Sequence, residues 1–420
     1  MNNLRSSISY KDAACKCVVS QKFGSLNVAP VDLFVLSPNR DKDPISYILD
    51  SKKHAELLYG GASKSNTISR GSHTDGILAQ LILLSKSSSL ESYTRFFERN
   101  GFFFPLDPVN HTVVNANDII HLVKRISAIY ELHGIINTSF KILKDKKEGY
   151  RKILNNLILL LYSPPITLPL IDSRTQKERR ICPLKFTEFL FDPDFDYPSI
   201  SKQKYHDADY FEVEDAFFKT DRIKTTFYNA ILQGEPVPEI KNSDDVYFRQ
   251  LVAMHCSTEV PCKVKKIADF FYHFQIENGV LTSTDTEPVP RVKEFRLSEK
   301  MLEQLSVIAQ AVICEEISYY ISSAQPSIEP QVKESFQDNE TIIWKTDSLM
   351  QAIHIAIMHD YVNGFIYAKC KYSKCKRPYF PKSINNIKKE YCCTRCDNQD
   401  QSAKSKARKK QESEDTPNNQ

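Results

Sequence analysis

Cysteine spacing near the end of the chain is the feature of this sequence that most directly predicts chemistry. Five of the 11 cysteines lie between residues 370 and 396, where Cys370 and Cys375 form a C-x4-C pair and Cys392 and Cys396 form a C-x3-C pair. Zinc binds four thiolates in a tetrahedron, with Zn–S distances of about 2.3 Å, and two short pairs bring such a set together. We therefore predict one Zn²⁺ ion bound by these four cysteines. Because all four positions are taken by the protein, we expect a structural ion.

The third ligand of this set has an alternative. Cys393 follows Cys392 directly and would make a C-x2-C pair with Cys396. A second alternative is that the cysteines are reduced thiols without a metal. Two short pairs at this separation, in a chain read as belonging to a reducing compartment, are more typical of a zinc site. A segment this short cannot bury a core of its own, so we expect its folding to depend on the metal.

Basic residues accumulate in the same part of the chain. Between Ile366 and Gln420 there are 14 Lys or Arg residues and 6 Asp or Glu residues, so this segment has a net charge of +8 and residues 1–365 carry −4. Four thiolates and a Zn²⁺ ion lower the local charge to about +6. Such asymmetry indicates a polyanion-binding end, whereas the alternative is a solvated tail. The residues expected to contact nucleic-acid phosphates are Lys388, Lys389, Arg395, Lys404, Lys406, Arg408 and Lys409.

Two tyrosines lie among these basic residues. Tyr372 and Tyr379 are expected to stack on exposed bases, as aromatic side chains do in proteins that bind single strands.

Hydrophobic periodicity predicts the helices that must position these residues. Helical spacing of apolar residues occurs in segments 75–84, 90–99, 117–134, 150–162, 244–256, 264–276, 297–322 and 347–362. Gly134 is expected to end the third of these helices, and the aromatic block Phe102–Phe104 is expected to be buried. The last helix is expected to bury its apolar residues and to lead into Cys370. The first 70 residues, broken by prolines, predict short strands and turns.

The cysteine segment also has a recognisable order of residues. Tyr379 and Phe380 follow the first cysteine pair, Lys388 and Lys389 precede Tyr391-Cys392, and the run ends in Cys396-Asp397-Asn398-Gln399. This order resembles the CGNR-type zinc finger of bacterial proteins, in which a final Cys-Gly-Asn-Arg leads into a basic helix. Asp397 and Gln399 replace the Gly and the Arg of that signature. Residues 1–290 show no pattern of a known family.

The resemblance implies zinc binding and a role in DNA binding and transcription. It favours Cys392 over Cys393 as the third ligand, because Cys392 directly follows the aromatic Tyr391. The missing Arg at position 399 weakens the implication of DNA binding more than that of zinc binding.

These observations predict an α+β protein that is predominantly α-helical, with a mixed N-terminal region, a helical body and a C-terminal four-cysteine zinc-finger module. The expected segments are a mixed α/β region (1–110), a helical and mixed body (111–290), a helical segment leading into the finger (291–365), the finger with its basic extension (366–410) and a disordered tail (411–420).

The expected function is that of a non-enzymatic, zinc-stabilised nucleic-acid-binding protein, a bacterial regulator whose body senses a ligand or a partner. Its finger would contact DNA, or alternatively RNA, and the chain could form homo-oligomers. No apolar run reaches the roughly 20 residues that cross a bilayer, and the polar N-terminus leads into no signal-peptide core, so we expect no membrane and a cytoplasmic location.

Two other functions remain open. In the first, the finger is a folding module of a protein-interaction scaffold. In the second, the acidic run around Asp207 and Asp209 belongs to a metal-dependent nuclease or hydrolase, since such sites gather carboxylates around their ions.

Overall fold

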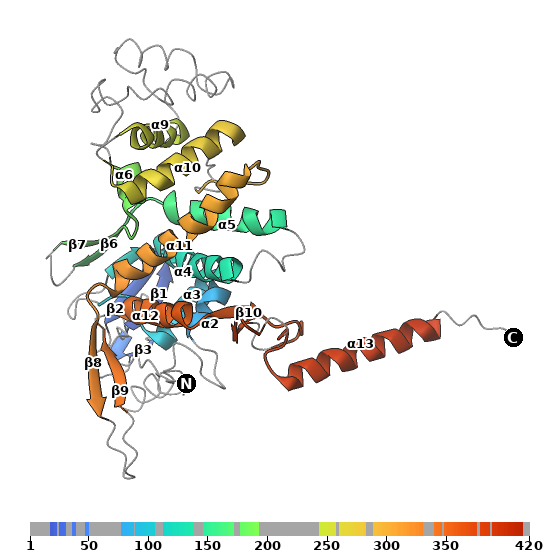
Figure 1. Ribbon diagram of the computed structural model, residues 1–420. Helices are drawn as coiled ribbons and strands as arrows, with labels where there is room; N and C mark the ends of the chain where they lie inside the picture. The colour runs from blue at the N-terminus through green and yellow to red at the C-terminus, as the bar shows by residue number, and fades with distance from the viewer. Residues whose placement is uncertain are drawn as a thin grey trace. The chain divides into compact units, whose positions relative to one another are not determined.

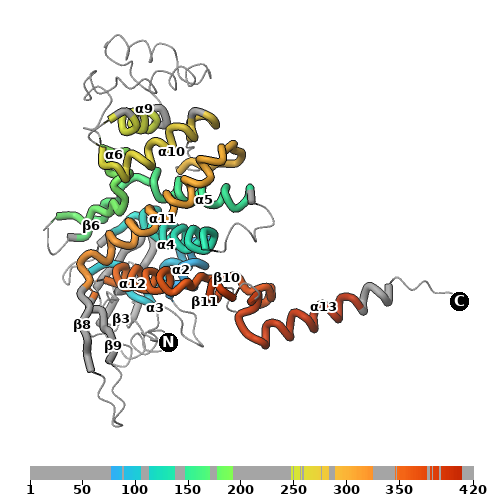
Figure 2. Tube along the Cα trace, in the orientation of Figure 1, coloured from blue at the N-terminus to red at the C-terminus, as the bar shows by residue number. Residues whose placement is uncertain are grey.

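The chain of 420 residues is described by a computed structural model (Figures 1 and 2). It describes residues 17–22, 25–30, 36–38, 47–49, 77–87, 89–105, 112–137, 146–171, 177–192, 243–257, 260–282, 289–330, 340–346, 348–375, 379–386 and 389–414. The fold of these residues is mostly helical, with a few small sheets. None of the helices in these ranges has the length and apolar character that a bilayer crossing requires.

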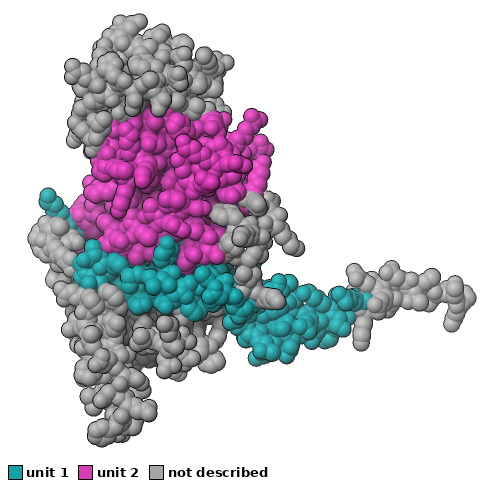
Figure 3. Space-filling model, in the orientation of Figure 1, with its two compact units in different colours: residues 1–130, 169–177, 320–420 teal, residues 131–168, 178–319 magenta. Residues whose placement is uncertain are grey.

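The chain divides into two compact units, which are coloured separately in Figure 3. Unit 1 comprises residues 1–130, 169–177 and 320–420, and unit 2 comprises residues 131–168 and 178–319. Both cysteine pairs and the basic segment belong to unit 1. The five segments expected from the sequence divide the chain differently from these two units, and that division stays a prediction.

Unit 1 contains a three-stranded antiparallel sheet of order β1-β2-β5, in which Val19 pairs with Val28 and Leu26 pairs with Val114. Two-stranded antiparallel pairs are formed by β3 with β4, β8 with β9 and β10 with β11. Its strands are β1 (Cys17–Lys22), β2 (Ser25–Pro30), β3 (Leu36–Pro38), β4 (Tyr47–Leu49), β5 (Thr112–Asn115), β8 (Gln325–Pro330), β9 (Glu340–Lys345), β10 (Phe365–Lys369) and β11 (Tyr379–Ser383). Its helices are α2 (Ile77–Leu84), α3 (Leu90–Asn100), the first part of α4 (Ala116–Asn137), α12 (Leu349–Val362) and α13 (Thr394–Glu414).

Aromatic side chains form a large part of the core of unit 1. Phe102, Phe103 and Phe104 are buried, as the sequence predicts. The Phe97 ring packs against Phe103, with 5.0 Å between ring centroids. The amide of Met350, in the first turn of α12, donates a hydrogen bond of 3.0 Å to the Phe103 carbonyl. This bond ties the aromatic block to the helix that precedes the cysteines.

Helix α12 is buried on nearly every side, including the five apolar residues expected from the sequence: Leu349, Met350, Ile353, Ala356 and Ile357. It begins at an N-cap, where the Ser348 hydroxyl accepts a hydrogen bond of 3.1 Å from the Gln351 amide. Such a cap satisfies one of the free N–H groups of the first turn. The chain then turns through Gly364 into β10.

Unit 2 is built mainly from helices. They are the last part of α4, α5 (Lys146–Leu161), α6 (Lys185–Leu190), α9 (Ser243–Cys256), α10 (Cys262–Asn278) and most of α11 (Glu299–Ile321); the unit also contains the first half of strand β6 (Ile166–Ile171) and the strand β7 (Glu178–Ile181). Helices α9 and α10 pack against each other (Figures 1 and 2). The Tyr162 ring packs against Phe186 and Phe271, with centroid distances of 5.9 and 5.4 Å.

The predicted helices all occur within one to a few residues of their expected bounds, with two differences at helix ends. The expectation that Gly134 ends its helix is wrong, because α4 continues to Asn137. There the Asn137 side chain donates a hydrogen bond of 2.9 Å to the His133 carbonyl. At the C-terminal end, α13 runs to Glu414 and so passes residue 410, where the basic extension was expected to stop.

Candidate metal centre and the adjoining basic helix

A β-hairpin positions the first cysteine pair. Strands β10 and β11 are antiparallel, with Lys369 opposite Tyr379 at the end next to the cysteines. Cys370 follows β10 directly, and the chain then turns back, so that the Cys375 amide donates a hydrogen bond of 3.0 Å to the Tyr372 carbonyl. The hairpin and this turn bring the two sulfurs within 4.8 Å of each other.

The start of helix α13 positions the second pair. Cys392 lies just before the helix and Cys396 lies in its first turn, where the Cys396 amide donates a hydrogen bond of 3.1 Å to the Cys393 carbonyl. Lys371 joins the two halves, because its amide bonds to the Glu390 carbonyl at 3.0 Å and its ammonium pairs with the Glu390 carboxylate at 2.6 Å. The two turns that carry the cysteines are therefore held together by a backbone hydrogen bond and by an ion pair.

The sulfur atoms of Cys370, Cys375, Cys392 and Cys396 all lie within 4.8 Å of one another. Cys375 is 3.6 Å from Cys392 and from Cys396, and the last two sulfurs are 3.4 Å apart. Sulfurs at about 2.3 Å from a tetrahedral zinc ion are about 3.8 Å from one another. The cluster thus has the size and the donor set that one metal ion of this kind requires, and it consists of the four residues expected from the sequence.

Cys393 is the remaining cysteine near the cluster. Its sulfur is 3.8 Å from that of Cys392, but its side chain is exposed, whereas Cys370 and Cys396 are buried. Among the described residues, the four-cysteine cluster is the group that could hold a metal, and Cys393 is not part of it.

Metal binding to this cluster would require the loss of thiol protons. Burial, followed by hydrogen bonds with Cys396 and Cys375, raises the pKa of the Cys392 thiol far above its usual range. Burial likewise raises the pKa of the Cys396 thiol to about 12. Thiolates packed this closely repel one another, so full ionisation requires a cation at their centre. The set can therefore bind one metal ion with release of protons.

The core around the cysteines is very small. Cys370, Phe380 and Cys396 are its buried members, and the partly buried Tyr372 and Tyr391 pack against it. So few apolar residues do not stabilise a fold by themselves. A bound ion would supply the missing stability, since the binding free energy of a structural metal is also folding free energy.

The residues expected to contact phosphate lie in different environments. Lys404 forms an ion pair of 2.5 Å with Asp400, one turn earlier on α13. The Lys389 ammonium lies 5.3 Å from the centre of the Phe380 ring. Arg395, Lys406 and Arg408 are exposed on α13, and no carboxylate pairs with them within the described residues. Lys409 belongs to α13 but its side chain lies outside the described part, and so does the whole of Lys388.

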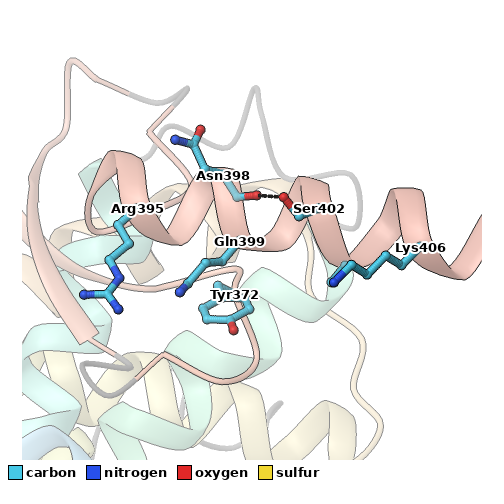
Figure 4. Close-up of a pocket in the computed structure, with 7 residues that line it drawn as sticks. Tyr372, Arg395, Asn398, Gln399, Ser402 and Lys406 are labelled. Atoms are coloured by element: carbon cyan, nitrogen blue, oxygen red, sulfur yellow. Dashed lines mark hydrogen bonds between the residues drawn. The ribbon is translucent and has the colours of Figure 1, made fainter.

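An open groove of about 580 Å³ lies beside the first turns of α13 (Figure 4). Tyr372 forms one side, and the other side consists of residues from α13: Arg395, Asn398, Gln399, Ser402, Ala403 and Lys406. Figure 4 shows the side chains of Arg395, Gln399 and Lys406 on the same side of the helix, with the Tyr372 ring beside Gln399. The sequence analysis missed this groove, although the spacing 395, 399, 402, 406 is that of one helical face.

The second tyrosine expected to stack on bases is engaged within the protein. The Lys86 ammonium lies 4.8 Å from the centre of the Tyr379 ring and donates a hydrogen bond to the Tyr379 hydroxyl. This contact attaches β11 to the end of α2. Of the two tyrosines, Tyr372 is therefore the one whose ring is better placed to stack on a base.

The acidic run that contains Asp207 and Asp209 lies outside the described residues, and the alternative nuclease function stays a prediction. Comparison of the chain with protein families, curated proteins and solved structures finds no match.

Proposed function

We propose that this protein is a zinc-stabilised nucleic-acid-binding protein, a bacterial regulator whose body senses a ligand or a partner and whose C-terminal module contacts nucleic-acid phosphates. One observation carries the proposal. Four cysteine sulfurs lie within 4.8 Å of one another at the start of a helix that exposes basic side chains.

Zinc is the metal that suits this donor set best. Thiolate ligands select soft or borderline ions, and a site with four cysteines and no open position is typical of structural zinc. The resemblance of the segment to the CGNR-type zinc finger supports the same choice. Zinc would fix the turns around both cysteine pairs, and with them the first turn of α13.

Basic groups on α13 supply the affinity for phosphate. Each Lys or Arg that neutralises a phosphate releases condensed counterions, which favours binding at moderate salt. Gln399 stands where the CGNR signature has an Arg, but Arg395 lies one turn earlier on the same face of the helix. A positive group thus remains available at this end of the face. DNA is the expected target, with RNA as the alternative.

Binding assays with three forms of the full-length protein test this function. Fluorescence anisotropy would measure the affinity of wild type, Cys375→Ser and Cys393→Ser for mixed-sequence duplex and single-stranded DNA and RNA, at about 50 mM salt. Cys375→Ser removes a cluster sulfur, whereas Cys393→Ser removes the exposed neighbouring thiol and serves as its matched control.

We expect wild type and Cys393→Ser to bind equally well and Cys375→Ser to lose binding. Absence of wild-type binding to all four pools would contradict the proposed function. Equal binding by Cys375→Ser would show that the metal module is not needed for it.

A further inference from the structure

The groove beside α13 combines an aromatic ring with a helical face that carries only basic and neutral side chains. Arg395, Gln399, Ser402 and Lys406 follow one another at intervals of four, three and four residues, so they share one face of the helix. Tyr372 approaches this face from the turn between the first two cysteines (Figure 4).

We propose that this groove binds a single strand of nucleic acid, with one unstacked base on the Tyr372 ring and phosphates of the same strand on Arg395 and Lys406. The inference rests on the proposed function and names the class of substrate.

The Tyr372 ring is held in place by the cluster. Tyr372 is half-buried, packing against the cysteine cluster while it also lines the groove. A ring fixed in this way loses little conformational freedom when a base stacks on it. The Gln399 side chain lies beside the ring, where its amide can donate to or accept from the edge of a stacked base (Figure 4).

The charges on α13 are sorted by face. Arg395 and Lys406 line the groove, while Asp397 and Asp400 do not. Asp400 pairs with Lys404, and Asp397 accepts a hydrogen bond from Gln401; neither Lys404 nor Gln401 lines the groove. A polyanion in the groove would therefore meet a lining that carries positive groups and no carboxylate.

The length of the groove also suits a strand. Arg395 and Lys406 are 11 positions apart, which corresponds to about 16 Å along a helix axis. Between them lie Ser402 and Ala403, which are small, and the Ser402 hydroxyl is turned back onto the Asn398 carbonyl at 2.8 Å. The middle of the groove is left open to sugar and base, and the two charged ends can reach separate phosphates.

A single strand uses this arrangement better than a duplex does. In a duplex the bases are stacked on one another, so a protein ring cannot take the place of a neighbouring base without distortion. In a single strand the bases can be splayed out and stacked on aromatic side chains, with little dependence on sequence. A duplex would contact only the basic groups and would leave Tyr372 without a role.

The test compares four substitutions in the full-length, zinc-loaded protein. The probes are labelled single strands of DNA and of RNA, about 16 nucleotides long, and the DNA duplex of the same sequence. Tyr372→Leu removes the ring but keeps an apolar side chain against the cysteines, and Tyr372→Phe keeps the ring. Lys406→Gln and Lys404→Gln each remove one positive charge, from the groove face and from the Asp400 ion pair respectively. Zinc content is measured for every variant.

We expect wild type to bind the single strands more tightly than the duplex. Tyr372→Leu should weaken single-strand binding about tenfold and leave duplex binding unchanged, while Tyr372→Phe should bind like wild type. Lys406→Gln should weaken binding more than Lys404→Gln. Comparison of the affinities for the DNA strand and the RNA strand shows which of the two nucleic acids the groove prefers.

Preference for the duplex would overturn the inference, and so would equal single-strand affinity of wild type and a zinc-loaded Tyr372→Leu; both leave the proposed function in place. If wild type binds none of the probes, the proposed function fails together with the inference.

Discussion

Lys404 and Asp400 form an ion pair of 2.5 Å one turn apart on α13, and the Tyr391 hydroxyl donates a hydrogen bond of 2.9 Å to the same carboxylate. Lys406, two residues further on, lines the groove instead. Lys404 and Lys406 are thus in different electrostatic surroundings, although they lie close together on the same helix. Lys406 shares the groove-lining face with Arg395, whereas Lys404 does not line the groove.

Asp400 is expected to limit the affinity for nucleic acid. The hydrogen bond that the Asp400 carboxylate accepts from Lys404, followed by the one from Tyr391, lowers the pKa of this carboxyl group, so it is ionised at neutral pH. Asp400→Asn removes one negative charge near the phosphate-binding side chains. We expect affinity to rise about two- to threefold at low salt, measured by anisotropy. Zinc content should not change, and a fall in affinity with full zinc content would contradict this role.

The metal centre predicts one zinc ion per chain. Elemental analysis of protein purified without chelators should give about one zinc per chain, with a large loss in Cys375→Ser. Cys393→Ser is the matched control and should keep its zinc, because its exposed sulfur is outside the cluster of four. Substitution by Co²⁺ should give the visible bands of a tetrahedral thiolate site. If Cys393→Ser lost zinc as fully as Cys375→Ser, the assignment of ligands would be wrong.

From the buried side chain of His354 we expect the protein to lose stability in mild acid. This side chain is buried in α12, stacks on Tyr320 with 4.0 Å between ring centroids, and accepts no hydrogen bond at Nε2 from any described residue. Burial, and to a lesser extent the charge of Arg125, lowers its pKa to about 4 from the usual 6.5. Between these two values the unfolded chain binds more protons than the folded chain. Stability is therefore full above about pH 6.5 and falls as the pH drops towards 4.

Denaturant unfolding of wild type and His354→Gln at a series of pH values measures this effect. Between about pH 7 and pH 5 the wild type should lose about 2 kcal/mol more than the variant. Burial also lowers the pKa of His121 to about 4, so part of the slope should remain in the variant. Parallel pH profiles for the two proteins would show that His354 does not titrate in this way.

Two glycines are expected to respond in opposite ways to alanine. Gly364 has a φ of 63°, and a Cβ atom there would lie 2.9 Å from Cδ1 of Ile384. Gly364→Ala should destabilise unit 1 by about 1–2 kcal/mol and weaken zinc retention, because this turn leads into β10 and Cys370. Gly134 lies within α4, and a Cβ atom there would have no neighbour within 4 Å.

Gly134→Ala should therefore stabilise the protein by about 0.5–1 kcal/mol. Thermal or denaturant unfolding of both variants beside wild type gives the comparison. Stabilisation by Gly364→Ala would be inconsistent with the close approach of Ile384.

The helices and the cysteine cluster could be predicted from the sequence because each depends on local spacing. Apolar residues in α12 repeat with the helical period, and its start is marked by Ser348. The two cysteine pairs are short, so each places its sulfurs by a single turn. Gly134 is a case where local spacing gave the wrong helix end. A glycine is tolerated inside a helix, so its presence alone does not mark the last turn.

Which side chains are accessible to a bound nucleic acid could not be predicted in the same way. Tyr379 is covered by Lys86, which is 293 positions away in the sequence, so nothing near Tyr379 indicates the contact. The ion pair of Lys404 could have been predicted, because Asp400 precedes it by four residues on a helix. The groove required the position of Tyr372 against α13, which depends on how the two cysteine turns come together.

The dependence of binding on salt tests the central claim most directly. Affinity of the zinc-loaded, full-length protein for mixed-sequence single-stranded and duplex nucleic acid would be measured by anisotropy from about 50 to 200 mM salt. Contact between the basic face of α13 and phosphates predicts binding at the lowest salt and a linear, steep fall of log affinity with log salt. Removal of zinc by a chelator should abolish this binding. No binding at about 50 mM salt, or an affinity that does not change across the series, would contradict the account.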